Sequence, residues 1–109
     1  MIRVMNVISD TNIGGAGRVL LNYLRYAGRE RFETLVALPR GSLLKAPLEE
    51  AGGRVLEVDG IADRSFDRGD VKALRALIAR ERPDLVHTHG CFSGRVAARR
   101  EGVPVIYSR

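Results

Sequence analysis

The sequence predicts an α/β fold: a doubly wound parallel sheet of about five strands, with helices on both faces. Three observations support this prediction. Short apolar runs alternate along the whole chain with segments of helical period, as in sheets built from βαβ units. The apolar runs contain few polar residues, which is typical of strands buried on both faces. Glycine, proline and polar loops separate the runs from the helical segments. Right-handed crossovers then favour the strand order 3-2-1-4-5.

The first strand and the first helix are expected at residues 3–8 and at about residues 15–27. The strand is nearly all apolar. The helix is predicted from one apolar stripe with a period of 3.6 residues. The members of that stripe are Val19, Leu20, Tyr23, Leu24 and Ala27.

Two further strands are expected at residues 32–38 and 54–58, where apolar residues dominate again. A short helix over about residues 42–51 should connect them, with Ser42 as its N-cap. Pro47 is compatible with that helix only if it falls in the first turn, because proline lacks a backbone N–H.

A longer helix is expected from residue 71 to about residues 80–82, and Asp67 and Asp70 are its candidate N-caps. Pro83 follows its last turn and enforces the end.

A fourth strand is expected at residues 85–88, followed by a loop at residues 89–93 and a short helix that ends at Gly102. Residues 103–107 form the last expected strand. The whole chain is then one Rossmann-like domain.

Two loops at one edge of this sheet carry the candidate site. In the order 3-2-1-4-5 the first and fourth strands are neighbours, and ligands bind outside the carboxyl ends of strands at such a switch point. Residues 10–18 and 89–93 follow those two strands. Gly14 and Gly15 let a ligand approach the backbone, and the helix that begins there offers free N–H groups suited to phosphate. A glycine turn that serves only packing is the alternative.

The chain is basic, with a net charge of +5 and two clusters of arginine. The clusters are Arg25, Arg29 and Arg31, and Arg95, Arg99 and Arg100. They form either a solvated face or a surface for phosphorylated ligands or anionic lipid, so peripheral contact with an anionic membrane is a hypothesis. Nucleic acid is not expected as a partner, because no aromatic residues interleave with the arginines.

Cytoplasmic localisation is expected from three features. The single cysteine, Cys91, fits a reducing compartment. No apolar run approaches the roughly 20 residues of a membrane span. The chain also enters its first strand without a signal-peptide pattern.

The same part of the sequence also offers residues for other chemistries. His87, His89 and Cys91 alternate, and would share one face as metal ligands if the strand continued that far. The plainer interpretation is a packed His87 and a His89 at the strand tip, able to hydrogen-bond a substrate or to exchange a proton near neutral pH. A receiver domain is not expected, because the chain lacks the paired acid and the lysine that such a domain needs. A dinucleotide fingerprint fails because Leu20 stands at its third glycine position.

Two stretches resemble a known family. IGGAGRVLLNYL, residues 13–24, resembles the "GGAER" segment that opens family 4 glycosyltransferases of the GT-B fold. RPDLVHTHGCFSGRVAARREGVPVIYSR, residues 82–109, resembles their "PDIVHTHG … GVPVI" segment. Members of this family have two Rossmann-like domains that face each other across a cleft. The resemblance covers the first part of the N-terminal one.

The resemblance implies substrate-binding residues but no catalytic residue within this chain. Gly14 and Gly15 match the glycine loop that touches the donor phosphate, Arg18 matches the family's arginine, and Gly17 replaces its glutamate. His89 matches the second histidine of the H-T-H segment, which looks toward the cleft. The expected substrate-binding residues are Gly14, Gly15, Ala16, Arg18, His89 and Gly90. No metal or resident cofactor is expected.

The function implied is the acceptor side of a retaining, metal-independent glycosyltransferase. It would transfer sugar from a nucleotide diphosphate sugar to a glycan or lipid-linked acceptor, in polysaccharide biosynthesis for example. The sequence ends at Arg109, where a covering helix would normally follow, so we expect an incomplete N-terminal domain without its donor domain. Residues 1–109 alone should therefore be inactive. The alternative is a non-catalytic module that binds a nucleotide or phosphorylated ligand.

Overall fold

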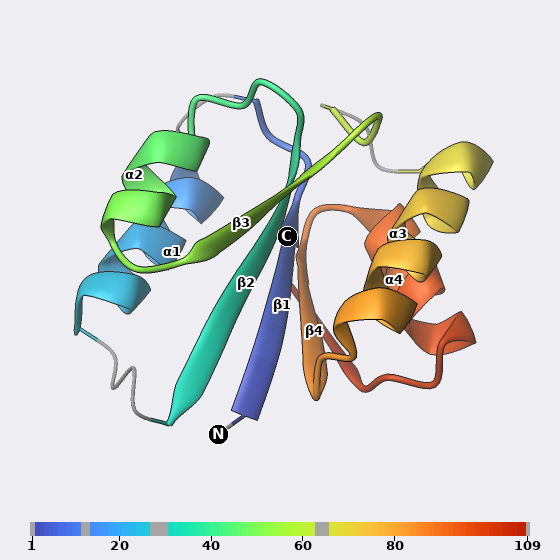
Figure 1. Cartoon of the computed structure of the whole chain (residues 1–109). Helices are drawn as coiled ribbons and strands as arrows, with labels where there is room; N and C mark the ends of the chain where they lie inside the picture. Colours follow the sequence, from blue (N-terminus) through green and yellow to red (C-terminus); the bar gives the residue numbers. More distant parts are fainter. Residues whose placement is uncertain (1, 12–13, 27–30, 63–65, 109) are drawn as a thin grey trace.

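The computed structural model describes residues 2–11, 14–26, 31–62 and 66–108. Its elements are β1 (Ile2–Ile8), α1 (Gly15–Tyr26), β2 (Phe32–Pro39), α2 (Lys45–Glu50), β3 (Arg54–Val58), α3 (Arg68–Glu81), β4 (Leu85–His89), α4 (Phe92–Arg100) and β5 (Val105–Ser108). All strand pairs are parallel, and the order is β3-β2-β1-β4-β5, which confirms the predicted fold and topology. In Figure 1, α1 and α2 lie on one side of the sheet and α3 and α4 on the other.

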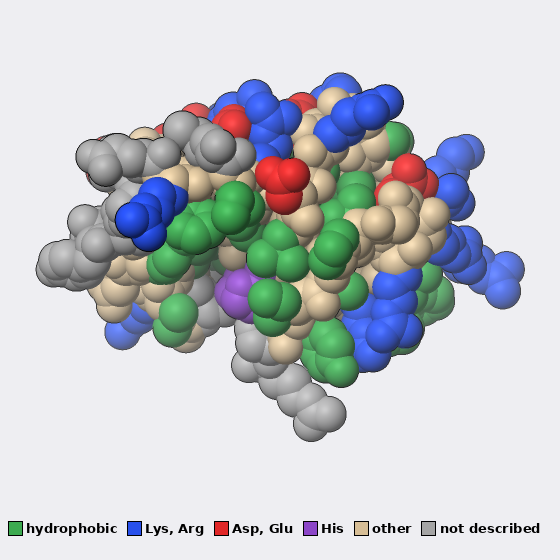
Figure 2. All heavy atoms as spheres, turned by 90° about the horizontal axis from the view of Figure 1, so that it is seen from below, with side chains coloured by type: hydrophobic (Ala, Val, Ile, Leu, Met, Phe, Trp, Pro, Cys, Tyr) green, Lys and Arg blue, Asp and Glu red, His purple; other side chains and the backbone are tan. Residues whose placement is uncertain are grey.

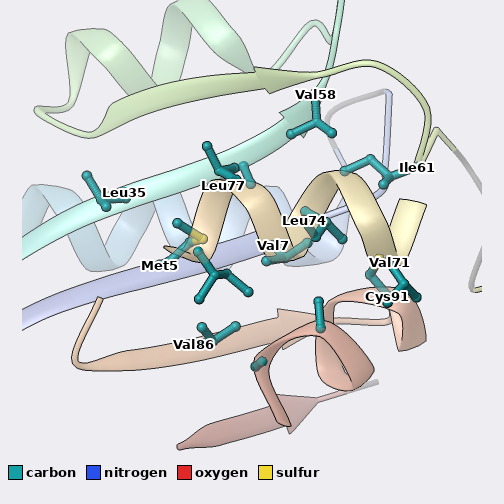
Figure 3. Packing of buried hydrophobic residues seen from close by; sticks show 14 residues of the cluster. Met5, Val7, Leu35, Val58, Ile61, Val71, Leu74, Leu77, Val86 and Cys91 are labelled. Carbon is teal, nitrogen blue, oxygen red and sulfur yellow. The ribbon is translucent and has the colours of Figure 1, made fainter. Parts of the chain in front are cut away.

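The sheet has a buried apolar cluster on each face, because successive residues of a strand point to opposite faces. Met5 and Val7 of β1 belong to the cluster under α3 and α4, and Ile8 belongs to the other. Figure 3 shows the first cluster, in which Leu74 and Leu77 of α3 pack toward the strands. The apolar residues of α3 that are buried in this cluster are Val71, Leu74, Leu77 and Ile78.

The apolar stripe of α1 is rotated from the predicted one. Leu20, Leu21 and Leu24 are buried, whereas Val19 and Tyr23 are 65% and 41% exposed. The expectation for Val19 and Tyr23 was therefore wrong, and Ala27 lies outside the described residues. The buried positions follow the i, i+3, i+4, i+7 spacing when they are counted from Gly17. Gly17 faces Leu44, so the side of α1 that carries Gly17 is the side that packs against the rest of the domain.

Of the three residues predicted as N-caps, Asp67 is confirmed, whereas Asp70 and Ser42 are not N-caps. Asp67 caps α3, accepting a hydrogen bond from the Asp70 backbone N–H over 3.1 Å, and Asp70 itself lies in the first turn. Ser42 is not an N-cap, because α2 begins only at Lys45. The Ser42 hydroxyl instead accepts from the Leu44 backbone N–H and donates to the Asp10 carbonyl. Ser42 thereby ties the turn before α2 to the loop after β1.

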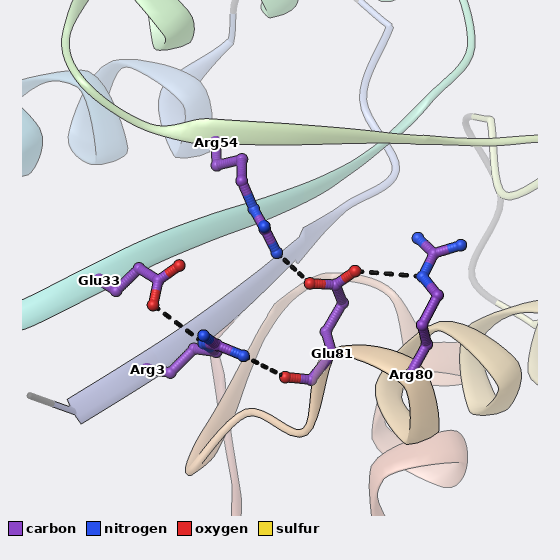
Figure 4. A network of polar contacts seen from close by, with 5 residues as sticks. All are labelled: Arg3, Glu33, Arg54, Arg80 and Glu81. Carbon is purple, nitrogen blue, oxygen red and sulfur yellow. Dashed lines mark hydrogen bonds and ion pairs between the residues drawn. The ribbon is translucent and has the colours of Figure 1, made fainter.

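Ion pairs fasten the amino edge of the sheet, away from the candidate site (Figure 4). Arg3 of β1 pairs with Glu33 of β2 over 2.9 Å and donates to the Glu81 carbonyl at the end of α3. The Glu81 carboxylate pairs with Arg54 of β3 and with Arg80. Burial alone would raise the pKa of Glu81, but the bonds and charges of Arg80 and Arg54 lower it. This network joins three strands to α3.

Candidate functional site at the carboxyl edge of the sheet

The structure places the two candidate loops side by side. Ile8, the last residue of β1, stands in register with His89, the last residue of β4. The glycine loop and Gly90 therefore leave the same edge of the sheet from neighbouring strands, as the switch-point argument predicted. β4 is one residue longer than expected, so His89 belongs to the strand rather than to the loop.

The three glycines near the start of α1 have different surroundings. A Cβ at Gly15 would meet no heavy atom within 4 Å, so nothing in the described part of the chain fills the space beside it. A Cβ at Gly17 would lie 2.5 Å from Leu44 Cδ2, so Gly17 serves the packing of α1 on α2. A Cβ at Gly14 would lie 3.7 Å from Asp10 Oδ2. The packing alternative thus applies to Gly17, whereas the space beside Gly15 is open and its phosphate role stays a prediction.

Gly17, at the position where the resembling family has a glutamate, belongs to the helix and not to the loop. It lies inside α1, two residues after the helix begins, and its neighbour is the fully buried Leu44. A glutamate side chain could not occupy this position without displacing Leu44.

Among the described residues around the glycines at the start of α1, Arg18 supplies a cation and Asp10 an anion. Arg18 is exposed on the first turns of α1 and forms no ion pair with any residue that the structure describes. α1 has no acidic residue in its first turn, so its positive dipole end is not offset there. Asp10 contributes a carboxylate beside Gly14. An anion is therefore favoured near Gly15 and Arg18, and a neutral hydroxyl near Asp10.

His89 is held by a buried partner on the adjacent strand. Its Nε2 lies 3.1 Å from Oδ1 of Asn6, which is buried in the middle of β1. An amide oxygen only accepts, so His89 Nε2–H is the donor and Nδ1 carries a lone pair. The ring is therefore fixed in one tautomer.

His89 is neutral at physiological pH. Burial, and then the neighbouring His87, lower its pKa to about 4. Burial also lowers the pKa of His87. The expectation of proton exchange near neutral pH is therefore wrong for His89, since a group with this pKa holds no proton at pH 7 beyond its Nε2–H.

The two histidines stack on one face of the sheet. Their ring centroids lie 4.1 Å apart with 27° between the planes. In Figure 2, histidine surface appears among hydrophobic side chains. Cys91 does not join them, because it is buried in the cluster on the opposite face, under α3 and α4. Within the described ranges no group of three or more His, Cys, Asp or Glu side chains is arranged to hold a metal ion.

Two other predicted residues have plainer positions. Gly90 has φ +71°, so it makes the left-handed turn between β4 and α4, and nothing stands within 4 Å of its missing Cβ. Ala16 lies in α1, but its side chain is outside the described part of the structure.

Asn6 is the site residue that sequence reasoning missed. It is the one uncharged polar residue in the run Ile2–Ile8, and in this interior position it needs a hydrogen-bond partner. A polar residue inside an otherwise apolar strand was therefore the signal in the sequence that could have identified Asn6.

The comparisons with known proteins agree with this geometry. The sequence model of Glycosyltransferase Family 4 matches residues 13–109, which is most of the chain and includes residues 13–18 of the first candidate loop and all of the second. This chain belongs to glycosyltransferase family 4. No protein of curated function matches the sequence.

Solved structures share the fold of this family 4 domain at low sequence identity. A glycosyltransferase from Rickettsia africae superposes with a TM-score of 0.74 at 15% identity, over 97% of this chain and 29% of its own. MurG from Acinetobacter baumannii gives 0.74 at 17% identity, over 98% and 34%. The S. aureus MnaA–UDP co-structure gives 0.72 at 18% identity, over 98% and 30%. The family 4 chain thus spans about a third of the length of these proteins and has the Rossmann-like fold of a GT-B N-terminal domain.

Proposed function

We propose that this family 4 domain forms the acceptor side of a retaining, metal-independent glycosyltransferase that uses a nucleotide diphosphate sugar in the cytoplasm. The observation that carries the proposal is the open space beside Gly15, at the start of α1 and next to the carboxyl end of β4. The retained configuration and the independence from metal are proposed from the family resemblance. The acceptor is a glycan or a lipid-linked sugar.

The donor diphosphate is assigned to the start of α1. Free N–H groups and the helix dipole favour an anion there. Gly15 leaves room for close approach, and the exposed Arg18 adds one positive charge. Asp10 disfavours phosphate beside Gly14, so the diphosphate should lie toward Gly15.

The acceptor is assigned to the ends of β1 and β4. Neutral His89 offers Nδ1 as a hydrogen-bond acceptor, because Asn6 already occupies Nε2. The Asp10 carboxylate offers a second acceptor for sugar hydroxyls. Both groups position an acceptor hydroxyl; neither is assigned the transfer of a proton. Holding donor and acceptor together in reactive geometry can lower the barrier to transfer by roughly 7 to 11 kcal/mol. That arrangement requires a second wall of the cleft.

The test is a titration of this chain with UDP-sugars and GDP-sugars. We expect no glycosyl transfer by residues 1–109, and calorimetric binding no tighter than about 1 mM, or about −4 kcal/mol. Amide NMR should nevertheless show shifts at Gly14, Gly15 and Arg18, while Gly102 serves as the distant control. The variant Gly15→Val should abolish those shifts with the fold retained, because its side chain enters the phosphate position.

Two results would contradict this proposal. Shifts confined to residues away from the start of α1 would remove the donor assignment. Micromolar binding of a nucleotide by this chain alone would favour the alternative, an independent nucleotide-binding module.

A further inference from the structure

A second surface lies on the outer side of α3 and α4, away from the candidate site at the carboxyl ends of β1 and β4. These two helices pack side by side (Figure 1) and leave a groove of about 890 Å³ between them. Its apolar lining comes from Val71, Ala76 and Ala79 of α3 and from Val96 of α4. Nothing in the proposed glycosyl transfer uses this groove.

The rim of the groove is strongly cationic. Four basic residues and one acid line it: Arg68, Lys72, Arg75, Arg100 and Glu101. Glu101 is already paired with Arg75 over 2.8 Å. The other three cations form no ion pair within the part of the chain that the structure describes. Figure 2 shows Lys and Arg side chains projecting on the side that α3 and α4 occupy.

Exposed aromatic rings lie at one end of the same groove. Phe66 lines it, and its ring contacts that of Phe92 at a centroid distance of 5.7 Å. The two residues are 51% and 46% exposed, although both are large and apolar. The Arg95 guanidinium extends this row, 5.8 Å from the Phe92 ring and 3.9 Å from the Tyr107 ring.

The aromatic end of the groove is also the end nearest the candidate site. Phe66 follows β3, and Phe92 begins α4 just after β4, so both lie at the carboxyl edge of the sheet. The unpaired cations Arg68 and Lys72 lie on the first turns of α3, close to this edge, and Arg100 lies at the far end of α4.

We propose that the α3–α4 groove docks this domain on an anionic phospholipid surface, with Phe66 and Phe92 entering the interface between headgroups and acyl chains. Unpaired cations beside exposed aromatic rings match the two layers of such an interface, phosphate outside and hydrocarbon inside. A dissolved anion would use the cations and leave the rings in water. No helix within the described ranges is long and apolar enough to cross a bilayer. The proposed contact is a peripheral one. Docking in this orientation brings the carboxyl ends of β1 and β4 close to the membrane.

The first test is co-sedimentation of the chain with phosphatidylcholine vesicles and with vesicles that also contain phosphatidylglycerol. Binding should require the anionic lipid and should weaken with added salt. The double variant Arg68→Gln/Lys72→Gln should lower the partition coefficient about 25-fold, a factor of about 5 for each cation near the surface. Arg31→Gln/Arg82→Gln is the matched control. It removes the same charge from exposed positions at the amino edge and should change binding less than about 3-fold.

The second test locates the aromatic contact. The chain has no tryptophan, so Phe92→Trp introduces a single fluorescent reporter. Its emission should shift to the blue with anionic vesicles and become protected from aqueous iodide. Leu43→Trp is the control, because Leu43 is 64% exposed in the turn before α2, on the other side of the sheet.

Several outcomes would overturn the docking proposal and leave the proposed transfer reaction untouched. Equal losses of vesicle binding in the two double charge variants would show that binding depends on net charge and not on the groove. Equal binding to neutral and anionic vesicles would remove the role of the cations. A reporter at position 92 that stays accessible to iodide would exclude insertion. Sedimentation velocity showing a dimer that Arg68→Gln/Lys72→Gln dissociates would assign the groove to a second copy instead.

Discussion

His89 of β4 and Asn6 of β1 are joined by a hydrogen bond of 3.1 Å between Nε2 and Oδ1. The bond spans neighbouring strands at the switch point, and it fixes both the tautomer and the orientation of the imidazole. One ring nitrogen is thereby committed to the fold, and the other is left for a ligand.

Removing the hydrogen-bond acceptor of His89, the Asn6 side-chain amide, should destabilise the domain. Asn6→Leu keeps the volume of the side chain but leaves the His89 Nε2–H unpaired in a half-buried position. We expect a loss of about 1–3 kcal/mol in the free energy of unfolding, measured with urea. The double variant Asn6→Leu/His89→Leu should recover part of that loss, because no unpaired polar group remains. A single variant as stable as the parent would show that the bond contributes nothing.

Stability should fall as the pH drops from about 7 to about 5. The pKa of His89 is about 4 in the folded chain and about 6.5 when unfolded, so only the unfolded state takes up a proton in that interval. The lowered pKa of His87 acts in the same direction. The contribution of His89 to the free energy of unfolding is at most about 3 kcal/mol. It is fully present above pH 6.5 and is lost as the pH falls toward 4. Urea unfolding at a series of pH values should show a smaller slope for His89→Gln, and an equal slope would contradict the assignment.

Two neighbouring glycines should respond oppositely to alanine. Gly15→Ala meets open space and improves helix propensity, so stability should rise by up to about 1 kcal/mol. Gly17→Ala forces Leu44 to move, and the overpacking should cost about 1–3 kcal/mol. Thermal unfolding compares the two. In a double-mutant cycle, Leu44→Ala should make Gly17→Ala less costly; additive losses would rule out the contact.

Cys91 should react slowly in the folded chain. The thiol is buried against Val71 in the core under α3 and α4 (Figure 3), and burial raises its pKa. Both effects lower the accessible thiolate. Ellman's reagent should therefore modify the native chain much more slowly than the urea-unfolded chain at the same pH. Equal rates would mean that this part of the core opens readily.

The sheet could be predicted from the sequence because its signals are local. Apolar runs bounded by Pro39, Gly41 and Pro83 define the strands and their connections, and right-handed crossovers then favour the order 3-2-1-4-5. Asp67 was identifiable as a cap for the same reason, since its bond to the Asp70 backbone N–H spans three residues.

The parts that sequence reasoning missed depend on partners far away in the chain. Leu44 decides which face of α1 is buried, through its contact with Gly17. Asn6 lies 83 residues from His89, and no local pattern announces their bond or the burial that lowers the pKa of His89. Open space beside Gly15 likewise exists only once the sheet has assembled.

The parallel sheet also determines how this domain can be attached to other objects. β1 begins at the amino edge, where Arg3 and Glu33 are paired, whereas β5 ends with Ser108 in register with His89. An affinity tag or a biosensor linkage at the amino terminus would therefore leave the carboxyl ends of β1 and β4 facing solution. The same linkage at the carboxyl terminus would emerge beside His89 and obstruct any sugar that approaches it.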